Sequence, residues 1–188
     1  MNKLLKLPLF LGICGAGCAG VLAGVNEFTA PKIEAAKIER ANAAYIKMYK
    51  SFGVVSDDIE VVAVEDDALL AAGCNTKAII ENDSVKGITY TCSTKGYGGT
   101  ISFQVAFGNG NYVGYTDLGH TETDGYGKSL ISALSKTLKS IGDANISLNS
   151  DSTYASAMAG KSITGKAIAK VIEVCRVDYL AWYTTNNG

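Results

Sequence analysis

The sequence has little of what catalytic and metal centres commonly use: one histidine, two prolines and one tryptophan in 188 residues. Its five cysteines include no Cys-x-x-Cys pair and no cysteine–histidine cluster, which disfavours a zinc or iron–sulfur site within this chain alone. The net charge is −1 and no long basic run occurs. A nucleic-acid partner is therefore not expected, because such proteins carry a concentrated positive patch.

One long apolar segment is present near the N-terminus. Residues 7–25 carry no charge, and their length is near the lower limit for a membrane-spanning helix. Small residues recur at every fourth position, on one helical face that permits close packing against another helix: Gly12, Ala16, Gly20 and Gly24. A cleaved signal peptide is the alternative, but its apolar region is shorter and ends in a small-residue cleavage site. The pattern favours a retained membrane anchor.

The charges around this segment predict its orientation. Lys3 and Lys6 precede it closely, whereas the basic residues after it lie further away among acidic ones. The positive-inside rule then places the N-terminus in the cytoplasm and the remainder outside. We expect three parts: residues 1–28 as a cytoplasmic stub and transmembrane helix, 29–55 as a linker helix, and 56–188 as a domain.

The domain is predicted to be α+β, because its strand-like segments are grouped together with helices before and after them. The strands are expected at residues 59–65, 76–80, 85–92, 100–107 and 111–118. Asn109-Gly110 is a strong signal for a two-residue hairpin turn, so the sheet should be antiparallel. A helix is expected over 128–141, a loop over 149–160, and a second helix from about 162–165. The tail from Tyr179 to Gly188 is expected to end in a frayed polar run.

Residues 119–127, Gly-His-Thr-Glu-Thr-Asp-Gly-Tyr-Gly, join an expected strand to an expected helix and contain the only histidine. Glycines at such a junction let backbone N–H groups approach a ligand closely, and the following helix N-terminus favours an anion. His120 and Glu122 could exchange protons, but no paired nucleophile is evident. The stretch is either a phosphate or cofactor loop or a glycine-rich turn with a surface histidine.

Residues 160–166, Gly-Lys-Ser-Ile-Thr-Gly-Lys, form a second candidate anion site. Backbone N–H donors at a helix start, positive charge and space near the backbone are what a phosphate needs. Ser162 and Thr164 are also ordinary N-cap residues, which is the purely structural alternative.

These motifs resemble those of the FMN-binding domain family. Residues 119–127 are similar to its H-x-E-T-P-G-L-G signature, residues 95–101 resemble its G-Y-x-G-x-I segment, and residues 159–167 fall where it carries S/T-G-A-T-x-T-S. The family includes the G subunit of Rnf-type electron transport complexes and the C subunit of sodium-pumping NADH:quinone reductases. The apolar span followed by a charged helix is most similar to the Rnf G subunit.

The resemblance implies that FMN is the cofactor. In the family, a separate flavin transferase joins the FMN phosphate to a threonine hydroxyl, and that position falls on Ser162, which keeps the hydroxyl. Tyr126, like Tyr97, is either a ring that stacks on a flavin or an ordinary surface or core residue. The implied cofactor-binding residues are Ser162, Gly160, Lys161, Thr164, His120, Glu122, Thr123, Gly125, Tyr126 and Gly127.

The implied function is electron relay in the cell membrane. The chain would be a single-span subunit of an Rnf-like ferredoxin:NAD oxidoreductase that moves sodium ions or protons, working with integral membrane subunits rather than as a complete enzyme. The alternatives are a structural subunit with a decayed flavin site, a stand-alone flavinylated extracellular electron carrier, and a secreted binding domain. A Cys74–Cys92 disulfide is conceivable in an outward-facing domain, although spacing does not establish it.

Overall fold

The computed structural model describes residues 29, 42–122 and 127–187. The chain divides into two compact units, Met1–Ala43 and Ala44–Gly188. The predicted membrane span, most of the predicted linker helix and residues 123–126 lie outside the described residues. Within the described ranges, no helix combines the length and the apolar character that crossing a membrane requires.

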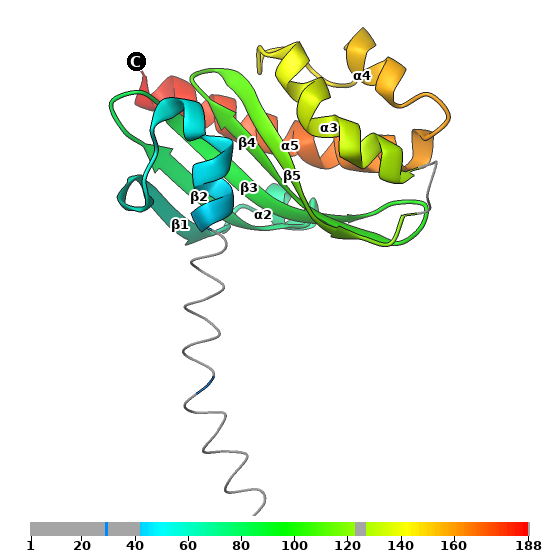
Figure 1. Cartoon of the computed structure of the whole chain (residues 1–188), viewed down its shortest axis with the longest axis horizontal. Helices are drawn as coiled ribbons and strands as arrows, with labels where there is room; N and C mark the ends of the chain where they lie inside the picture. The colour runs from blue at the N-terminus through cyan, green and yellow to red at the C-terminus, as the bar shows by residue number, and fades with distance from the viewer. Residues whose placement is uncertain (1–28, 30–41, 123–126, 188) are drawn as a thin grey trace, which may run out of the picture. The chain divides into compact units, whose positions relative to one another are not determined.

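The described part of the second unit contains an antiparallel sheet in which each strand pairs with its neighbour in the sequence (Figure 1). Its strands are β1 (Ile59–Ala63), β2 (Cys74–Glu81), β3 (Lys86–Lys95), β4 (Thr100–Gly108) and β5 (Asn111–His120). The φ angles of Asn109 and Gly110 are 49° and 77°, as a two-residue turn between strands of right-handed twist requires. The predicted α+β class and the predicted hairpin are both confirmed.

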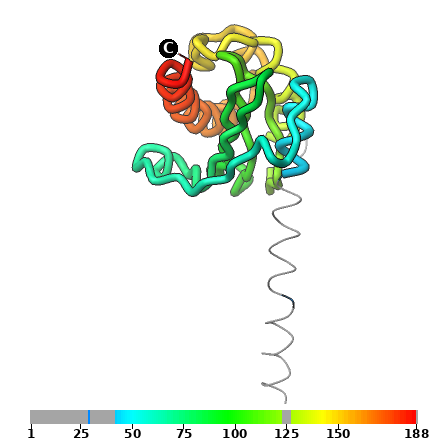
Figure 2. The backbone as a smooth tube through the Cα atoms, turned by 90° about the vertical axis from the view of Figure 1, so that its left-hand side faces the viewer, coloured from blue at the N-terminus to red at the C-terminus, as the bar shows by residue number. Residues whose placement is uncertain are grey.

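The described helices and turns surround this sheet. They are η1 (Lys50–Phe52), η2 (Ser56–Asp58), α2 (Asp67–Ala71), α3 (Gly127–Ile141), α4 (Ser152–Ala157) and α5 (Ser162–Asn186). In Figure 2, the orange and red α5 lies on one side of the green strands and the cyan segment around residues 44–52 on the other. Tyr49 joins this segment to the sheet, because its hydroxyl donates to the carbonyl oxygen of Phe107 at 2.6 Å.

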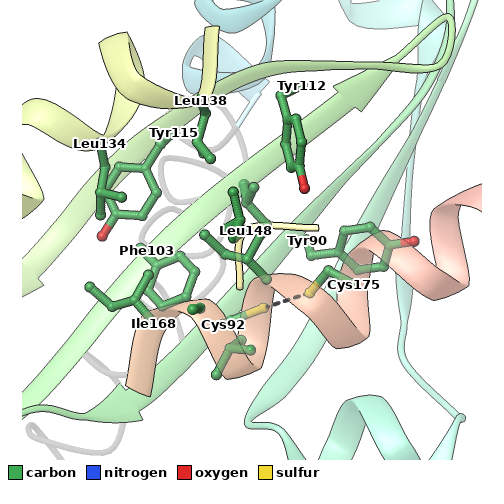
Figure 3. Close-up of a cluster of buried hydrophobic side chains, with 14 of the residues drawn as sticks. Tyr90, Cys92, Phe103, Tyr112, Tyr115, Leu134, Leu138, Leu148, Ile168 and Cys175 are labelled. Atoms are coloured by element: carbon green, nitrogen blue, oxygen red, sulfur yellow. Dashed lines mark hydrogen bonds between the residues drawn. The ribbon is translucent and has the colours of Figure 1, made fainter. Parts of the chain in front are cut away.

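The main core lies between the sheet and the pair α3 and α5. Alternate residues of β4 point into it and are fully buried: Ile101, Phe103, Val105 and Phe107. Residues at helical spacing on α3 and α5 belong to the same core: Leu130, Leu134, Leu138, Ile168, Val171, Ile172 and Cys175. Figure 3 labels Leu134, Leu138, Ile168 and Cys175 beside Phe103 of β4. The alternation of apolar residues along β4 and their helical spacing on α3 and α5 therefore decide which face of the sheet packs against which faces of the helices.

Two segments that the sequence predicts as irregular are helical. The expected loop at 149–160 contains α4, which begins because the Asp151 carboxylate accepts the N–H of Tyr154 at 2.7 Å. Tyr154 is buried, and its hydroxyl donates to the carbonyl of Gly165 at 2.8 Å. The polar run expected to be frayed at the end of the tail instead belongs to α5, which continues to Asn186. Tyr179, where the tail begins, is buried with its ring 5.0 Å from that of Phe107. In both cases tertiary burial decides the local structure.

Buried tyrosines make the stability of this domain sensitive to alkaline pH. Burial raises the pKa of Tyr179 to about 12 and also raises the pKa values of Tyr49, Tyr90, Tyr112, Tyr115 and Tyr154. The unfolded chain loses these protons near pH 10, before the folded chain does. Stability is therefore complete below about pH 10 and falls as the pH rises further, by about 1.4 kcal/mol per pH unit for each tyrosine.

Tyr115→Phe tests this predicted loss of stability at alkaline pH. The Tyr115 hydroxyl has no hydrogen-bond partner within the described part of the chain, so the substitution should leave the free energy of unfolding at pH 7 nearly unchanged. Urea unfolding between pH 10 and 11.5 should show a slope shallower by about 1.4 kcal/mol per pH unit. Tyr154→Phe is the control: it should also reduce the slope, but it should cost about 1 kcal/mol at pH 7, because a hydrogen bond to Gly165 is lost. If Tyr115→Phe leaves the pH dependence of the unfolding free energy unchanged, Tyr115 does not contribute to the alkaline loss of stability.

Candidate functional site

A cavity of about 490 Å³ lies beside the first turn of α5. Its volume is within the range of cofactor sites, about 300–1,000 Å³. The lining residues come from the β3–β4 turn, the start of α3 and the start of α5: Tyr97, Gly127, Gly160, Lys161, Ser162, Ile163 and Thr164. The fold thus brings the three sequence motifs, which lie up to 67 residues apart along the chain, to one place.

One buried carboxylate ties these segments together. Glu122 Oε1 accepts the N–H of Gly98 at 2.9 Å, and Glu122 Oε2 accepts the hydroxyl of Thr164 at 3.0 Å. The oxygen of that hydroxyl also accepts the N–H of Tyr97 at 3.3 Å. Glu122 is 7% exposed and Thr164 is 2% exposed. Buried polar groups are stable when they are hydrogen-bonded in this way, so the network fixes the β3–β4 turn against α5.

Two glycines of the motifs allow this carboxylate to sit where it does. A Cβ atom at Gly96 would lie 2.1 Å from Glu122 Oε1, and one at Gly127 would lie 2.0 Å from Glu122 Oε2. Both distances are shorter than any van der Waals contact, so any side chain at either position would displace the carboxylate. These glycines serve close packing around Glu122.

The first turn of α5 presents unpaired polar groups to the cavity. Lys161 is the N-cap residue and makes no side-chain capping bond, so the sequence-based alternative that Ser162 or Thr164 is the N-cap is wrong. Ser162 is exposed, and its hydroxyl makes no hydrogen bond to the described residues. The first N–H groups of a helix lack partners within the helix, and the first turn of α5 carries no acidic residue. This combination suits an anion next to a free hydroxyl.

Gly160 shapes the approach to this turn. Its φ angle is 73°, a left-handed conformation that glycine adopts readily, and no atom would lie within 4 Å of a Cβ atom there. The backbone beside Lys161 and Ser162 is therefore open, as close approach of a phosphate requires.

The remaining predicted site residues have other positions. His120 ends β5; its Nδ1 accepts the N–H of Glu122 at 3.2 Å, and its Nε2 lies 3.6 Å from Asp117 Oδ2. His120 and Glu122 are not among the residues that line the cavity. Glu122 instead bonds to Gly98 and to the lining residue Thr164. Thr123, Gly125 and Tyr126 lie outside the described residues.

Sequence reasoning missed Ile163 as a lining residue. Its side chain is 59% exposed, and that of Tyr97 is 72% exposed. Both line the cavity and offer apolar surface on which a flat ring could pack. The sequence did offer one indication. Ile163 stands between Ser162 and Thr164 at the expected helix start, and an apolar residue there that does not face the core is available to contact a ligand.

Comparison with known proteins agrees with this geometry. A family model described as the FMN-binding domain matches residues 96–176, a segment that contains every lining residue of the cavity. No curated protein matches the chain. The match supports the family predicted from the sequence, and it supports FMN as the cofactor. The residues present fit that group: an open backbone, a helix start and a free hydroxyl for the phosphate, and apolar side chains for the ring.

Proposed function

We propose that this chain is a membrane-anchored flavoprotein subunit that relays electrons in an Rnf-like ferredoxin:NAD oxidoreductase, with FMN joined to Ser162 through its phosphate. The observation that carries the proposal is the exposed Ser162 hydroxyl at the start of α5, in a cavity within the segment that the FMN-binding domain model matches. When bound, FMN supplies the redox chemistry, and the protein supplies attachment and orientation.

Each part of the cavity has a distinct role in this proposal. The N–H groups of the first turn of α5 and the Lys161 side chain would hold the phosphate. Tyr97 and Ile163 would pack against the ring system, because their exposed surfaces line the same cavity. Glu122 has an indirect role. Its bonds to Gly98 and Thr164 hold the β3–β4 turn and α5 at the separation that the cavity needs.

The membrane role rests on the sequence of the N-terminal part. Residues 7–25 are uncharged and carry small residues at every fourth position. On a helix these would share one face, which we propose packs against integral subunits of the complex. The lysines before this span support an orientation with the FMN-binding domain outside the cytoplasm. A flavin transferase would act on the domain there.

Gly20→Leu tests this membrane role. The protein should stay in the membrane fraction after carbonate washing, and the variant should recover at least several-fold less of the integral partner subunits, because bulk on the small-residue face blocks close helix approach. Val21→Leu is the matched control, since Val21 lies off that face, and it should leave recovery unchanged. A soluble mature form that begins after residue 25 would refute the anchor. Covalent FMN without any co-purifying integral subunit would favour a stand-alone electron carrier instead.

A further inference from the structure

Three cysteines meet in the core between the sheet and α5. Cys74 and Cys92 are directly opposed on β2 and β3 and form a disulfide. Cys175 projects from α5 toward them (Figure 3): its Sγ lies 3.4 Å from the Sγ of Cys74 and 3.6 Å from the Sγ of Cys92. The sequence shows no such cluster, because Cys175 is 83 residues from Cys92.

The surroundings favour thiol and disulfide chemistry over metal binding. All three cysteines are at most 3% exposed. Burial, and then the nearby Asp178 carboxylate, raise the pKa of the Cys175 thiol. The charged groups placed nearby already pair: Lys77 Nζ lies 3.6 Å from Asp178 Oδ2, which also accepts the hydroxyl of Tyr90 at 2.5 Å. A metal held by three thiolates would leave net negative charge in this core without compensation.

We propose that Cys74, Cys92 and Cys175 form a disulfide-exchange centre, in which the bond can move from within the sheet to a bond between the sheet and α5. In the step, the Cys175 thiol loses its proton and its sulfur attacks one sulfur of the Cys74–Cys92 bond. One S–S bond forms, one breaks, and the released cysteine takes up the proton. No oxidant or reductant is consumed.

The geometry makes this exchange slow in the closed structure. Thiolates attack along the axis of a disulfide, whereas the similar distances of 3.4 and 3.6 Å place Cys175 beside the bond. One cysteine side chain must rotate first, and burial keeps the thiolate scarce. Exchange therefore accompanies local opening of α5 from the sheet.

The exchange changes what the crosslink restrains. The Cys74–Cys92 bond joins residues 18 apart within one sheet. A bond to Cys175 would span 83 or 101 residues and would attach α5, the helix that begins at Ser162, to the sheet. A longer enclosed segment restricts the unfolded chain more strongly. The centre would thus lock the helix that borders the cavity, whether or not that cavity holds FMN.

Single cysteine variants of the full-length protein give the sharpest test. Each is equilibrated in a glutathione redox buffer, in which oxidised glutathione is the oxidant, and its disulfides are located by peptide mapping after acid quenching and alkylation. Cys74→Ser should form Cys92–Cys175, and Cys92→Ser should form Cys74–Cys175, each in at least half of the molecules. Cys175→Ser is the control and should keep Cys74–Cys92. Two free thiols in both of the first variants, in a buffer that fully crosslinks the control, would overturn the proposal.

The unsubstituted protein provides a second test that needs no variant to fold. Mapping in the same buffer, approached from both the reduced and the oxidised protein, should give one common mixture that contains Cys74–Cys92 and at least one bond to Cys175. Cys74–Cys92 alone, with Cys175 free at all times, would overturn the proposal. So would a metal ion at about one per chain together with three free thiols.

Discussion

Ser162→Ala is expected to abolish covalent FMN completely while the domain stays folded. The side chain is exposed and makes no hydrogen bond to the described residues, so the free energy of unfolding should change by about 0.5 kcal/mol or less. The proposed phosphoester bond to FMN, however, is formed by the Ser162 Oγ atom, which alanine lacks. Co-expression with a flavin transferase, followed by intact-mass measurement and in-gel flavin fluorescence, should show a modified parent protein and an unmodified variant.

Two matched variants separate the hydroxyl from its surroundings. Ser162→Thr keeps a hydroxyl at the same place and should keep the flavin. Thr164→Ala should still give covalently modified protein, because Ser162 is intact, but flavin per chain should fall as in Glu122→Ala. It should also cost about 1–3 kcal/mol of stability, because the Thr164 hydroxyl is buried and bonded to Glu122 and Tyr97. A modified mass in Ser162→Ala would show that another residue is the acceptor. An unmodified parent would favour the structural subunit with a decayed flavin site.

Glu122→Ala should both destabilise the domain and reduce its flavin content. The substitution removes the acceptor of the buried Thr164 hydroxyl and the acceptor of the exposed Gly98 N–H. We expect a loss of about 2–3 kcal/mol in the free energy of unfolding. Flavin per chain should fall several-fold, because the turn that carries Tyr97 is no longer held against α5. Urea unfolding and the ratio of flavin to protein absorbance measure the two effects.

Glu122→Gln is the conservative control for this network. Its amide oxygen can still accept the N–H of Gly98, and its amide nitrogen can donate to the Thr164 oxygen, so the loss should be about 1 kcal/mol. Gly127→Ala should act like Glu122→Ala, because the new Cβ would meet the carboxylate at 2.0 Å. Unchanged stability in both Glu122→Ala and Gly127→Ala would refute the role assigned to the carboxylate.

Local patterns were enough to predict most of the fold. The alternation of Ile101, Phe103, Val105 and Phe107 marks the buried face of β4, and Asn109-Gly110 marks the turn after it. The same local logic failed at residues 152–157 and in the polar run at the end of α5. Polar composition there indicates a loop and a frayed end, but the burial of Tyr154 and Tyr179 supplies the energy that keeps both segments helical.

For the candidate site, the sequence indicated the segments and the structure assigned their roles. The motifs at 95–101, 119–127 and 159–167 were recognisable as parts of one cofactor site. Which residues face the cavity could not be read from them, because that depends on how α5 approaches the sheet. Thr164 turns inward to Glu122 while Ser162, two positions earlier, stays exposed, and helical spacing alone does not say which of the two faces the core.

By itself, the sequence determined the α+β class, the hairpin, the buried faces of α3 and α5, and the three motifs, because each depends on residues close together along the chain. Only the tertiary structure decided the roles of Glu122, Gly96 and Gly127 and the meeting of Cys175 with Cys74 and Cys92. Those contacts join residues up to 101 positions apart. No periodicity or spacing encodes them, since they arise only when α5 packs on the folded sheet.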